Sequence, residues 1–415
     1  MRGKLLIFSA FLLLLGGGCS FLLRGKAELA QEEVPLPVYV QNLNEAITND
    51  LSALPELRPL DQAVDSFMNF WSLHGVSLSI MRNDSLVYAK GYGMADETTP
   101  MTPGTTLRMA SVSKLLTAMG VMKLQEEGKL FLDSPVFGPL GILNRYDSYI
   151  GDDNYSLITV EHLLRHQAGF TTRGGDPVFS PYTSRDALLR KQLGRRLAYE
   201  PGSTQEYSNF GFLLLSLIIE EVSGQPYEEY MQENIFEPAL CHGFRLGGNY
   251  LSERHPGESR YYMQPDAEKT ASFDGKYAAV EKCYGGNNVT GSAGAGGWTG
   301  STVELARLVA CADGHGPLQD ILADFSVNQM TNYFDADTFS LGWNDTKPSG
   351  EWTRSGSFSG TQALIKTYPD GECWVFISNT SSWRGSRFSR DIAGLFTSLR
   401  NRYSPLLPRR DLFQE

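Results

Sequence analysis

Two pairs of predicted β-strands, one near each end of the chain, constrain the fold more than any other feature of the sequence. The N-terminal pair lies within residues 76–89, where apolar segments flank the turn Arg82-Asn83-Asp84. The C-terminal pair lies within residues 362–378 and flanks Tyr368-Pro369-Asp370-Gly371, whose Pro, Asp and Gly favour a tight turn. Strands from both chain ends are therefore expected to join one antiparallel sheet.

The stretch between the strand pairs has helical patterns instead. Apolar residues recur at helical spacing in three of its segments, namely 160–166, 186–196 and 210–222. Helices are also predicted outside it, over 60–73 and 390–403. We therefore predict an α+β fold, with an antiparallel sheet from both chain ends flanked by helices (about 56–135 and 300–405) and an inserted all-helical lobe (about 136–299).

Composition narrows the classes of function. Hydrophobic residues make up 41% and charged residues 20% of the 415 residues, which is typical of a globular protein. The net charge is −11 and no long run of Lys or Arg is present, so nucleic acid is not expected as a partner. The five cysteines are far apart and form no Cys-x-x-Cys pair, which excludes a disulfide scaffold and disfavours a structural zinc site. No phosphate-binding GxxxxGK loop is present, and no cofactor is expected.

The N-terminal segment has the pattern of an export signal. Two basic residues precede the apolar run 5–15, which is too short to span the ~30 Å hydrocarbon core of a bilayer. Three glycines and Cys19 follow and resemble a bacterial lipobox, in which the cysteine is acylated. We predict a lipoprotein signal (1–18), a lipid on Cys19, a tether (19–55) and a folded domain (56–405) held in the bacterial cell envelope, at a periplasmic or outer-membrane face. An ordinary cleaved signal with an incidental cysteine is the alternative.

A serine and a lysine three residues apart open a predicted helix. Side chains at this spacing lie on one face, so the amine of Lys114 can reach the hydroxyl of Ser111. The helix N-terminus also favours developing negative charge, so the pair can form an activated nucleophile without histidine. A capping serine beside a surface lysine is the structural alternative.

Tyr207-Ser208-Asn209 is the only Tyr-x-Asn among nineteen tyrosines. A phenol with its free pKa of ~10 is a poor base, but neighbouring cations favour the phenolate. The amide of Asn209 can donate to a substrate carbonyl and accept from an amine. A loop tyrosine that caps the following helix is the alternative.

Arg354-Ser355-Gly356-Ser357 places a cation beside small residues on a predicted strand. Gly356 would let a substrate backbone lie close. The backbone N–H groups of Ser357 and Ser111 could then stabilise an oxyanion together. A solvated arginine on an edge strand is the alternative.

The order of these three motifs resembles the serine β-lactamase and penicillin-binding-protein superfamily, above all its class C-like branch. That branch contains class C β-lactamases, D,D-carboxypeptidases, D-aminopeptidases and related esterases. The resemblance covers roughly residues 60–400 and includes further family-like segments at 75–80, 89–96, 162–169, 207–212, 218–224 and 296–306.

The resemblance implies a role for each residue. Ser111 would be the acylated nucleophile, Lys114 its base or proton relay, and Tyr207 a second proton carrier. Asn209 would hold the substrate amide in a site between the sheet and the helical lobe. His162 and His166 are four residues apart and could hold a metal on a helix, but the family uses that segment for packing, so no metal is expected.

Arg354 departs from the family, which usually has Lys or His at this position. Arginine stays protonated and cannot act as a base. As a fixed cation it can still lower the pKa of Lys114 and favour the phenolate of Tyr207. Its planar guanidinium can also hold a carboxylate with two hydrogen bonds. We therefore expect Arg354 to bind the free carboxylate of a peptide-like substrate.

The leading interpretation is an exported serine hydrolase that works through an acyl-enzyme on an amide or ester carbonyl. A D-amino-acid peptide, a β-lactam or a small ester would fit as substrate. The alternative is a catalytically weak or inactive family member that binds cell-wall fragments or a protein partner. Specificity is expected to depend on the irregular stretches 140–185 and 245–300.

Overall fold

The computed structural model describes residues 42–179, 184–316, 318–331 and 339–414. The predicted signal (1–18), the lipidation site Cys19 and tether residues 20–41 lie outside the described residues. The strands are β1 (Gly75–Arg82), β2 (Ser85–Gly93), β3 (Leu107–Arg108), β4 (Arg245–Leu246), β5 (Trp298–Gly300), β6 (Asp345–Thr346), β7 (Trp352–Phe358), β8 (Thr361–Thr367) and β9 (Glu372–Ser378). The α-helices are α1 (Leu43–Ala46), α2 (Arg58–Trp71), α3 (Ser113–Glu126), α4 (Val160–Leu164), α5 (Arg185–Leu193), α6 (Asn209–Ser223), α7 (Tyr227–Met231), α8 (Val289–Ser292), α9 (Thr302–Ala310), α10 (Asp324–Thr331) and α11 (Phe388–Tyr403).

The main sheet joins the two ends of the chain, as predicted. Its six antiparallel strands lie in the order β2-β1-β9-β8-β7-β6. The N-terminal hairpin pairs with the C-terminal hairpin through β1 and β9, where Leu78 lies opposite Phe376. Both hairpins, the helices at the chain ends and the α+β fold class are therefore confirmed.

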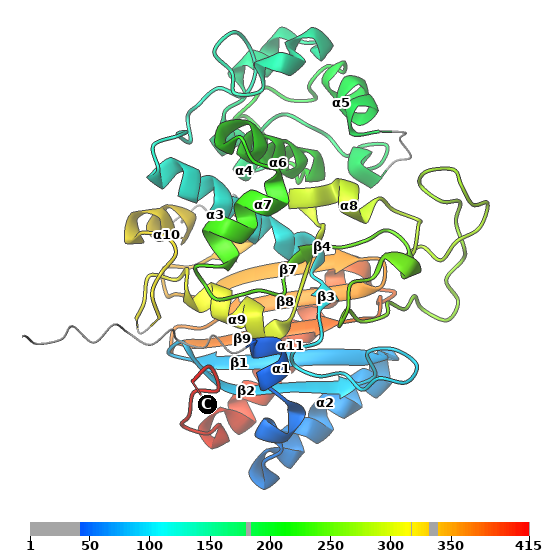
Figure 1. Ribbon diagram of the computed structural model, residues 1–415, viewed down its shortest axis with the longest axis vertical. Coiled ribbons are helices and arrows are strands. Elements are labelled where there is room, and N and C mark those ends of the chain that lie inside the picture. The colour runs from blue at the N-terminus through cyan, green and yellow to red at the C-terminus, as the bar shows by residue number, and fades with distance from the viewer. Residues whose placement is uncertain (1–41, 180–183, 317, 332–338, 415) are drawn as a thin grey trace, which may run out of the picture. The chain divides into compact units, whose positions relative to one another are not determined.

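Alternation along the strands gives the sheet two buried faces. Leu78 and Phe376 point to the face covered by α2 and α11. Ser77 and Ser79 point to the opposite face, where both hydroxyls form hydrogen bonds with Thr302 Oγ1 of α9, at 2.7 and 2.9 Å. Figure 1 shows α2 below the sheet and α4, α5, α6 and α7 above it.

Helix α3 lies between the sheet and the helices above it. Eleven of its side chains are buried, on all sides of the helix, so it has no solvent-facing stripe over most of its length. It packs against α6, which is similarly apolar. Because α3 begins at Ser113, two residues after Ser111, a buried helix fixes the position of that residue.

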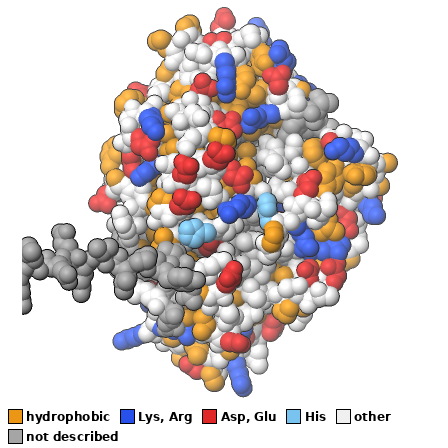
Figure 2. All heavy atoms as spheres, viewed as in Figure 1, with side chains coloured by type: hydrophobic (Ala, Val, Ile, Leu, Met, Phe, Trp, Pro, Cys, Tyr) orange, Lys and Arg blue, Asp and Glu red, His pale blue; other side chains and the backbone are white. Residues whose placement is uncertain are grey.

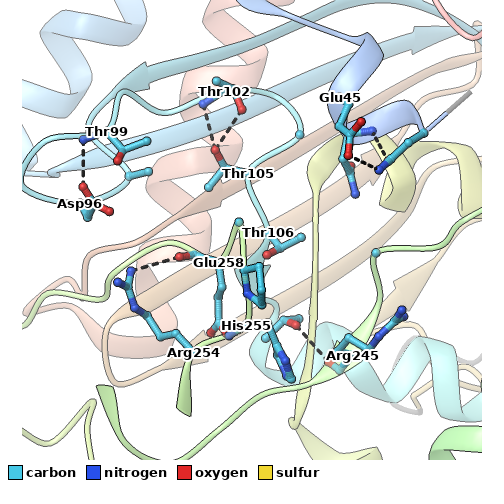
Figure 3. A pocket seen from close by; sticks show the side chains of 18 of the residues that line it. Glu45, Asp96, Thr99, Thr102, Thr105, Thr106, Arg245, Arg254, His255 and Glu258 are labelled. Atoms are coloured by element: carbon cyan, nitrogen blue, oxygen red, sulfur yellow. Dashed lines mark hydrogen bonds between the residues drawn. The ribbon is translucent and has the colours of Figure 1, made fainter. Parts of the chain in front are cut away.

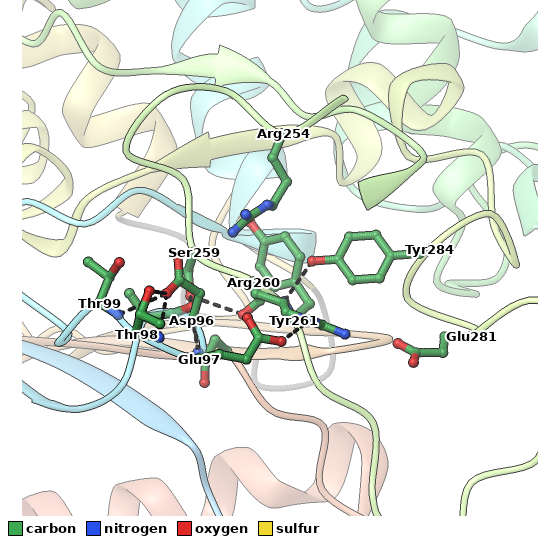
Figure 4. A network of polar contacts seen from close by, with 12 residues as sticks. Asp96, Glu97, Thr98, Thr99, Arg254, Ser259, Arg260, Tyr261, Glu281 and Tyr284 are labelled. Atoms are coloured by element: carbon green, nitrogen blue, oxygen red, sulfur yellow. Dashed lines mark hydrogen bonds and ion pairs between the residues drawn. The ribbon is translucent and has the colours of Figure 1, made fainter. Parts of the chain in front are cut away.

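The lobe inserted between the strand pairs is not entirely helical, which corrects the prediction. Strands β4 and β5 fall within residues 136–299 and form a small antiparallel sheet with β3. The irregular stretch 245–300 is tied to the loop after β2 by the polar network of Figure 4, in which Ser259 Oγ donates to the Ala95 carbonyl at 2.7 Å and Arg260 pairs with Glu97.

The folded unit is longer at both ends than the predicted 56–405. Residues 42–55, assigned to the tether, contain α1, whose Leu43 is buried in the core together with Ile47. At the other end Leu412 is also buried. The prediction missed these segments because each contributes only one or two apolar anchors, too few to give a periodic pattern.

The described residues contain no helix with the length and apolarity needed to cross a bilayer. On the face drawn in Figure 2, basic side chains are interspersed with acidic ones.

A buried carboxyl group, Asp84, meets a half-buried one, Asp313, where the β1–β2 turn packs against the loop after α9. Burial, and then the neighbouring Asp313, raise the pKa of Asp84 to about 7, and burial raises the pKa of Asp313 to about 6. Asp320 adds to the effect and His315 opposes it. Two carboxyls in contact in a site with little solvent share protons and titrate together.

We predict that Asp84→Asn flattens the pH dependence of stability. An unfolded carboxyl ionises near 3.8, whereas folded Asp84 ionises near 7, so the folded state binds more protons between these pH values and loses stability as the pH rises through them. The variant should raise the free energy of unfolding at pH 8 by on the order of 1–2 kcal/mol. Asn also tolerates the left-handed backbone of Asp84 (φ 62°).

Urea unfolding at pH 5 and pH 8 measures this effect, with the exposed Asp133→Asn as the matched control. Equal pH dependence in wild type and Asp84→Asn would contradict it.

Candidate active site

Ser111 lies in a short 3₁₀ turn (Ala110–Val112) that leads directly into α3. The preceding Ala110 has φ 50°, a left-handed conformation that is unfavourable for a residue with a side chain. Such strained positions concentrate at functional sites, where the surrounding fold holds them. The turn directs the hydroxyl of Ser111 toward Lys114 and Tyr207.

Lys114 is fully buried in the first turn of α3. Its Nζ donates to Ser111 Oγ at 3.2 Å, to Asn209 Oδ1 at 2.5 Å and to the Ala295 carbonyl oxygen at 2.5 Å. All three ammonium hydrogens therefore have acceptors, and the amine is fixed beside the serine hydroxyl.

Tyr207 approaches Ser111 from the start of α6. Its hydroxyl donates to Ser111 Oγ at 2.7 Å, and its ring lies 4.8 Å from Lys114 Nζ. The next residue, Ser208, caps α6 with its side chain, and its N–H donates to Nδ1 of His166 at 3.1 Å. The His166 ring packs on Tyr207 with centroids 4.5 Å apart. His166 therefore packs against and orients the tyrosine.

Burial and charge shift the ionisation of these groups. Burial lowers the pKa of Lys114 to about 8, with Arg354 adding to the shift and Tyr207 opposing it. For Tyr207, burial raises the pKa, but Lys114 and Arg354 outweigh it, and the net shift is downward. Burial, followed by the charges of Lys114 and Arg354, holds the pKa of His166 well below its usual value, so this ring is neutral. The amine and the phenol are thus both shifted toward forms that can accept a proton near neutral pH.

Asn209 is engaged more fully by the protein than the sequence suggested. Its Oδ1 accepts from Lys114, and its Nδ2 donates to Oδ2 of Asp176 at 2.7 Å. The residue is 7% exposed. We predicted that this amide holds the substrate, whereas in the structure it contacts Lys114 and Asp176.

Arg354 lies on β7 and faces Ser111, but not in the way predicted. It is 1% exposed, and its Nε donates to the Ser111 carbonyl oxygen at 2.8 Å, as does its Nη2. A guanidinium enclosed in this way cannot clamp a substrate carboxylate, so that prediction does not fit the structure. The residue instead anchors the backbone of Ser111 and contributes a buried positive charge beside Tyr207.

Gly356 allows β7 to lie directly against the serine turn. A Cβ atom at this position would stand 2.2 Å from the Met109 carbonyl oxygen and 3.1 Å from the Ser111 nitrogen, so no side chain fits. The N–H groups of Ser111 and Ser357, predicted as oxyanion donors, therefore belong to backbone segments in contact. Ser355 is held differently, because its N–H donates to Asn344 Oδ1 at 2.6 Å.

A pocket of about 360 Å³ opens beside Ser357. Its lining is mixed, with the hydroxyls of four serines, two amides and one lysine beside three larger apolar side chains. The lining residues are Phe179, Met263, Lys282, Asn287, Ser357, Phe358, Ser359, Gln362, Ser381, Ser382 and Gly385. Ser357 belongs both to this lining and to the predicted oxyanion donors, so the pocket adjoins the candidate site.

A larger cavity lies elsewhere. It measures about 790 Å³, is drawn in Figure 3, and its lining includes Glu45, Arg254 and Glu258 but none of the predicted site residues. Cavity volume alone therefore does not identify the candidate active site, whereas the contacts of Ser111 do.

Two contacts of the site were not predicted from the sequence. Asp176 follows two glycines in a loop, where no spacing connects it to Asn209. The Ala295 carbonyl that binds Lys114 is a backbone group, and no residue type marks it.

Comparison with known proteins shows the family. The family model Beta-lactamase matches residues 60–397. A protein named "Putative D-alanyl-D-alanine carboxypeptidase" from Escherichia coli (strain K12) is 27% identical over 321 residues, 71% of this chain and 72% of its own. Esterase EstB from Burkholderia gladioli is 26% identical over 309 residues, 68% of this chain and 77% of its own.

The fold is also that of solved structures. D-amino acid amidase from Ochrobactrum anthropi SV3 superposes with a TM-score of 0.64 at 19% identity, covering 82% of this chain and 98% of the amidase. The relatives named here are hydrolases of amides or esters by name. Because the family model matches most of its length, the chain belongs to the beta-lactamase family.

Proposed function

We propose that this protein is a serine hydrolase that forms an acyl-enzyme on Ser111. One observation supports the proposal above all: Ser111 Oγ lies 3.2 Å from the buried amine of Lys114 and 2.7 Å from the hydroxyl of Tyr207. Both distances allow direct proton transfer. An inactive binding protein would not need this arrangement of nucleophile, amine and phenol.

In the proposed first step, Ser111 Oγ attacks the substrate carbonyl carbon while its proton passes to the neutral amine of Lys114. The carbonyl oxygen takes up negative charge and accepts hydrogen bonds from the N–H groups of Ser111 and Ser357. The bond to the leaving group then breaks. Tyr207 gives its proton to the leaving amine or alcohol and regains one from Lys114. Water releases the acyl group from Ser111 in a second round.

We propose a D-amino-acid peptide as the substrate, ahead of a β-lactam or a small ester. The pocket beside Ser357 offers both polar and apolar contacts to a peptide end, and Lys282 in its lining supplies a cation, the role that Arg354 is too enclosed to fill. The name of the Escherichia coli relative supports this choice, while that of EstB favours an ester. We further propose export and lipid attachment at Cys19, which would place the enzyme next to the cell wall.

Intact-mass spectrometry after exposure to a penicillin, a D-Ala-D-Ala peptide and a p-nitrophenyl ester tests the proposal. We expect a mass increase equal to one acyl group with at least one compound, and the lifetime of the adduct reports deacylation. Turnover of the peptide alone would support the substrate class. If no compound acylates the protein or is turned over, the hydrolase proposal fails, and the inactive binder becomes the better interpretation.

A further inference from the structure

The loop 171–179 connects two sides of the candidate site. On one side, Thr172 donates its N–H to Oε1 of Glu206, the residue before Tyr207, at 2.7 Å. On the other side, the ring of Phe179 packs edge-on against Phe358 of β7, with centroids 5.3 Å apart. The loop is thus held between the start of α6 and the end of β7, and it carries Asp176 into the space between them.

Both carboxylate oxygens of Asp176 have partners. Oδ1 accepts from the Val178 N–H at 2.9 Å, a bond within the loop that fixes the carboxylate. Oδ2 accepts from Asn209 Nδ2 at 2.7 Å, and Asn209 Oδ1 accepts from Lys114 Nζ at 2.5 Å. A chain of three side chains therefore runs from the loop to the amine that contacts Ser111.

The donors and acceptors of Asp176 and Lys114 determine the orientation of the Asn209 amide between them. A carboxylate can only accept hydrogen bonds, so Asp176 selects the NH₂ end of the Asn209 amide. The carbonyl end then faces the Lys114 amine. The flipped amide would place two donors, an NH₂ and an ammonium, against each other, and two acceptors, the amide oxygen and the carboxylate, against each other. The ammonium form of Lys114 also disfavours the flipped amide, but the neutral amine can accept an N–H, so in that form the preference comes from Asp176.

We propose that Asp176 is a positioning residue, which orients the Asn209 amide and through it holds the Lys114 amine beside Ser111 Oγ. This inference rests on the proposed function, in which that amine accepts the proton of the serine. Asp176 also brings a negative charge near Lys114, and this charge raises the pKa of the lysine against the dominant effect of burial, which lowers it. Asp176 would therefore set both the place and the charge state of the base.

The test compares Asp176→Asn and Asp176→Leu with wild type in the rate of acylation by the compound that acylates the wild type. Asn can keep a hydrogen bond to Asn209 but lacks the charge, so the acidic limb of the pH–rate profile should move to lower pH with a rate change of only a few-fold. Leu removes both, and the rate should fall about 10- to 100-fold. Asp176→Glu keeps the negative charge and the hydrogen-bond acceptor, so it should retain most of the wild-type acylation rate. The exposed Asp153→Asn in the same lobe is the control and should match wild type.

Rates and profiles of both variants within twofold of wild type would overturn the inference while leaving the proposed function intact. If the wild type itself is never acylated, the proposed function fails, and ¹⁵N NMR titration of the Lys114 Nζ still decides the inference. Asp176→Asn should lower the pKa of Lys114, because it removes a negative charge. An unchanged lysine titration in a folded Asp176→Asn would contradict the role.

Discussion

Ser111→Ala should abolish covalent labelling and reduce turnover at least about 10³-fold, the size of loss that follows removal of a nucleophile. The hydroxyl oxygen is the atom on which the Lys114 and Tyr207 contacts converge. Alanine leaves both groups in place but provides no atom to attack the carbonyl. Residual turnover would come only from binding and from the oxyanion donors.

The measurement is intact mass after incubation with a fluorophosphonate or a penicillin, together with steady-state turnover. Ser66→Ala serves as the control, because Ser66 lies on the exposed side of α2 and its removal should leave labelling unchanged. Thermal unfolding should show that Ser111→Ala is folded. If the folded variant is still labelled to the wild-type extent, another residue is the nucleophile and the proposed mechanism is wrong.

The sheet and the contact between Ser111 and Lys114 could be predicted because their sequence patterns are local. Each hairpin has apolar segments around a turn that only a few residue types form, and helices packed on the joined hairpins bury both faces of the sheet. The Ser111–Lys114 spacing on a helix gives the contact between these two residues directly. Tyr207 was linked to them only by the family resemblance, because no local rule connects residues 96 positions apart.

The orientation of the site residues could not be predicted in the same way. Whether Arg354 faces the serine turn or the solvent depends on the register of β7, and a shift by one residue would reverse it. Asp176 lies in a loop without periodicity, and its partner was known only once α6 was placed. Burial then determines which partner a side chain can bind. Arg354 is 1% exposed, so its guanidinium binds the Ser111 carbonyl oxygen and is not open to a substrate.

Lys114→Met should lower the acylation rate about 10²- to 10⁴-fold, the usual range for a lost general base. Methionine is unbranched and flexible, so it can fill the space of the lysine side chain but accepts no proton. In wild type the acylation rate should rise with pH up to about 8, because burial lowers the pKa of Lys114 to that value and only the neutral amine accepts the serine proton. The variant should lose this dependence.

Lys123→Met on the same helix is the matched control, since its amine bonds the Ile321 carbonyl at 2.8 Å, away from Ser111. Stability should change much less than activity. Methionine removes the cost of burying a charge but leaves the acceptors at Asn209 and Ala295 without their donor, so we expect only a modest fall in the unfolding temperature, far smaller than the loss of activity. A variant that acylates at the wild-type rate would exclude Lys114 as the base. A variant that unfolds at a much lower temperature would show that the buried amine mainly stabilises the protein. We infer instead that its main role is in catalysis.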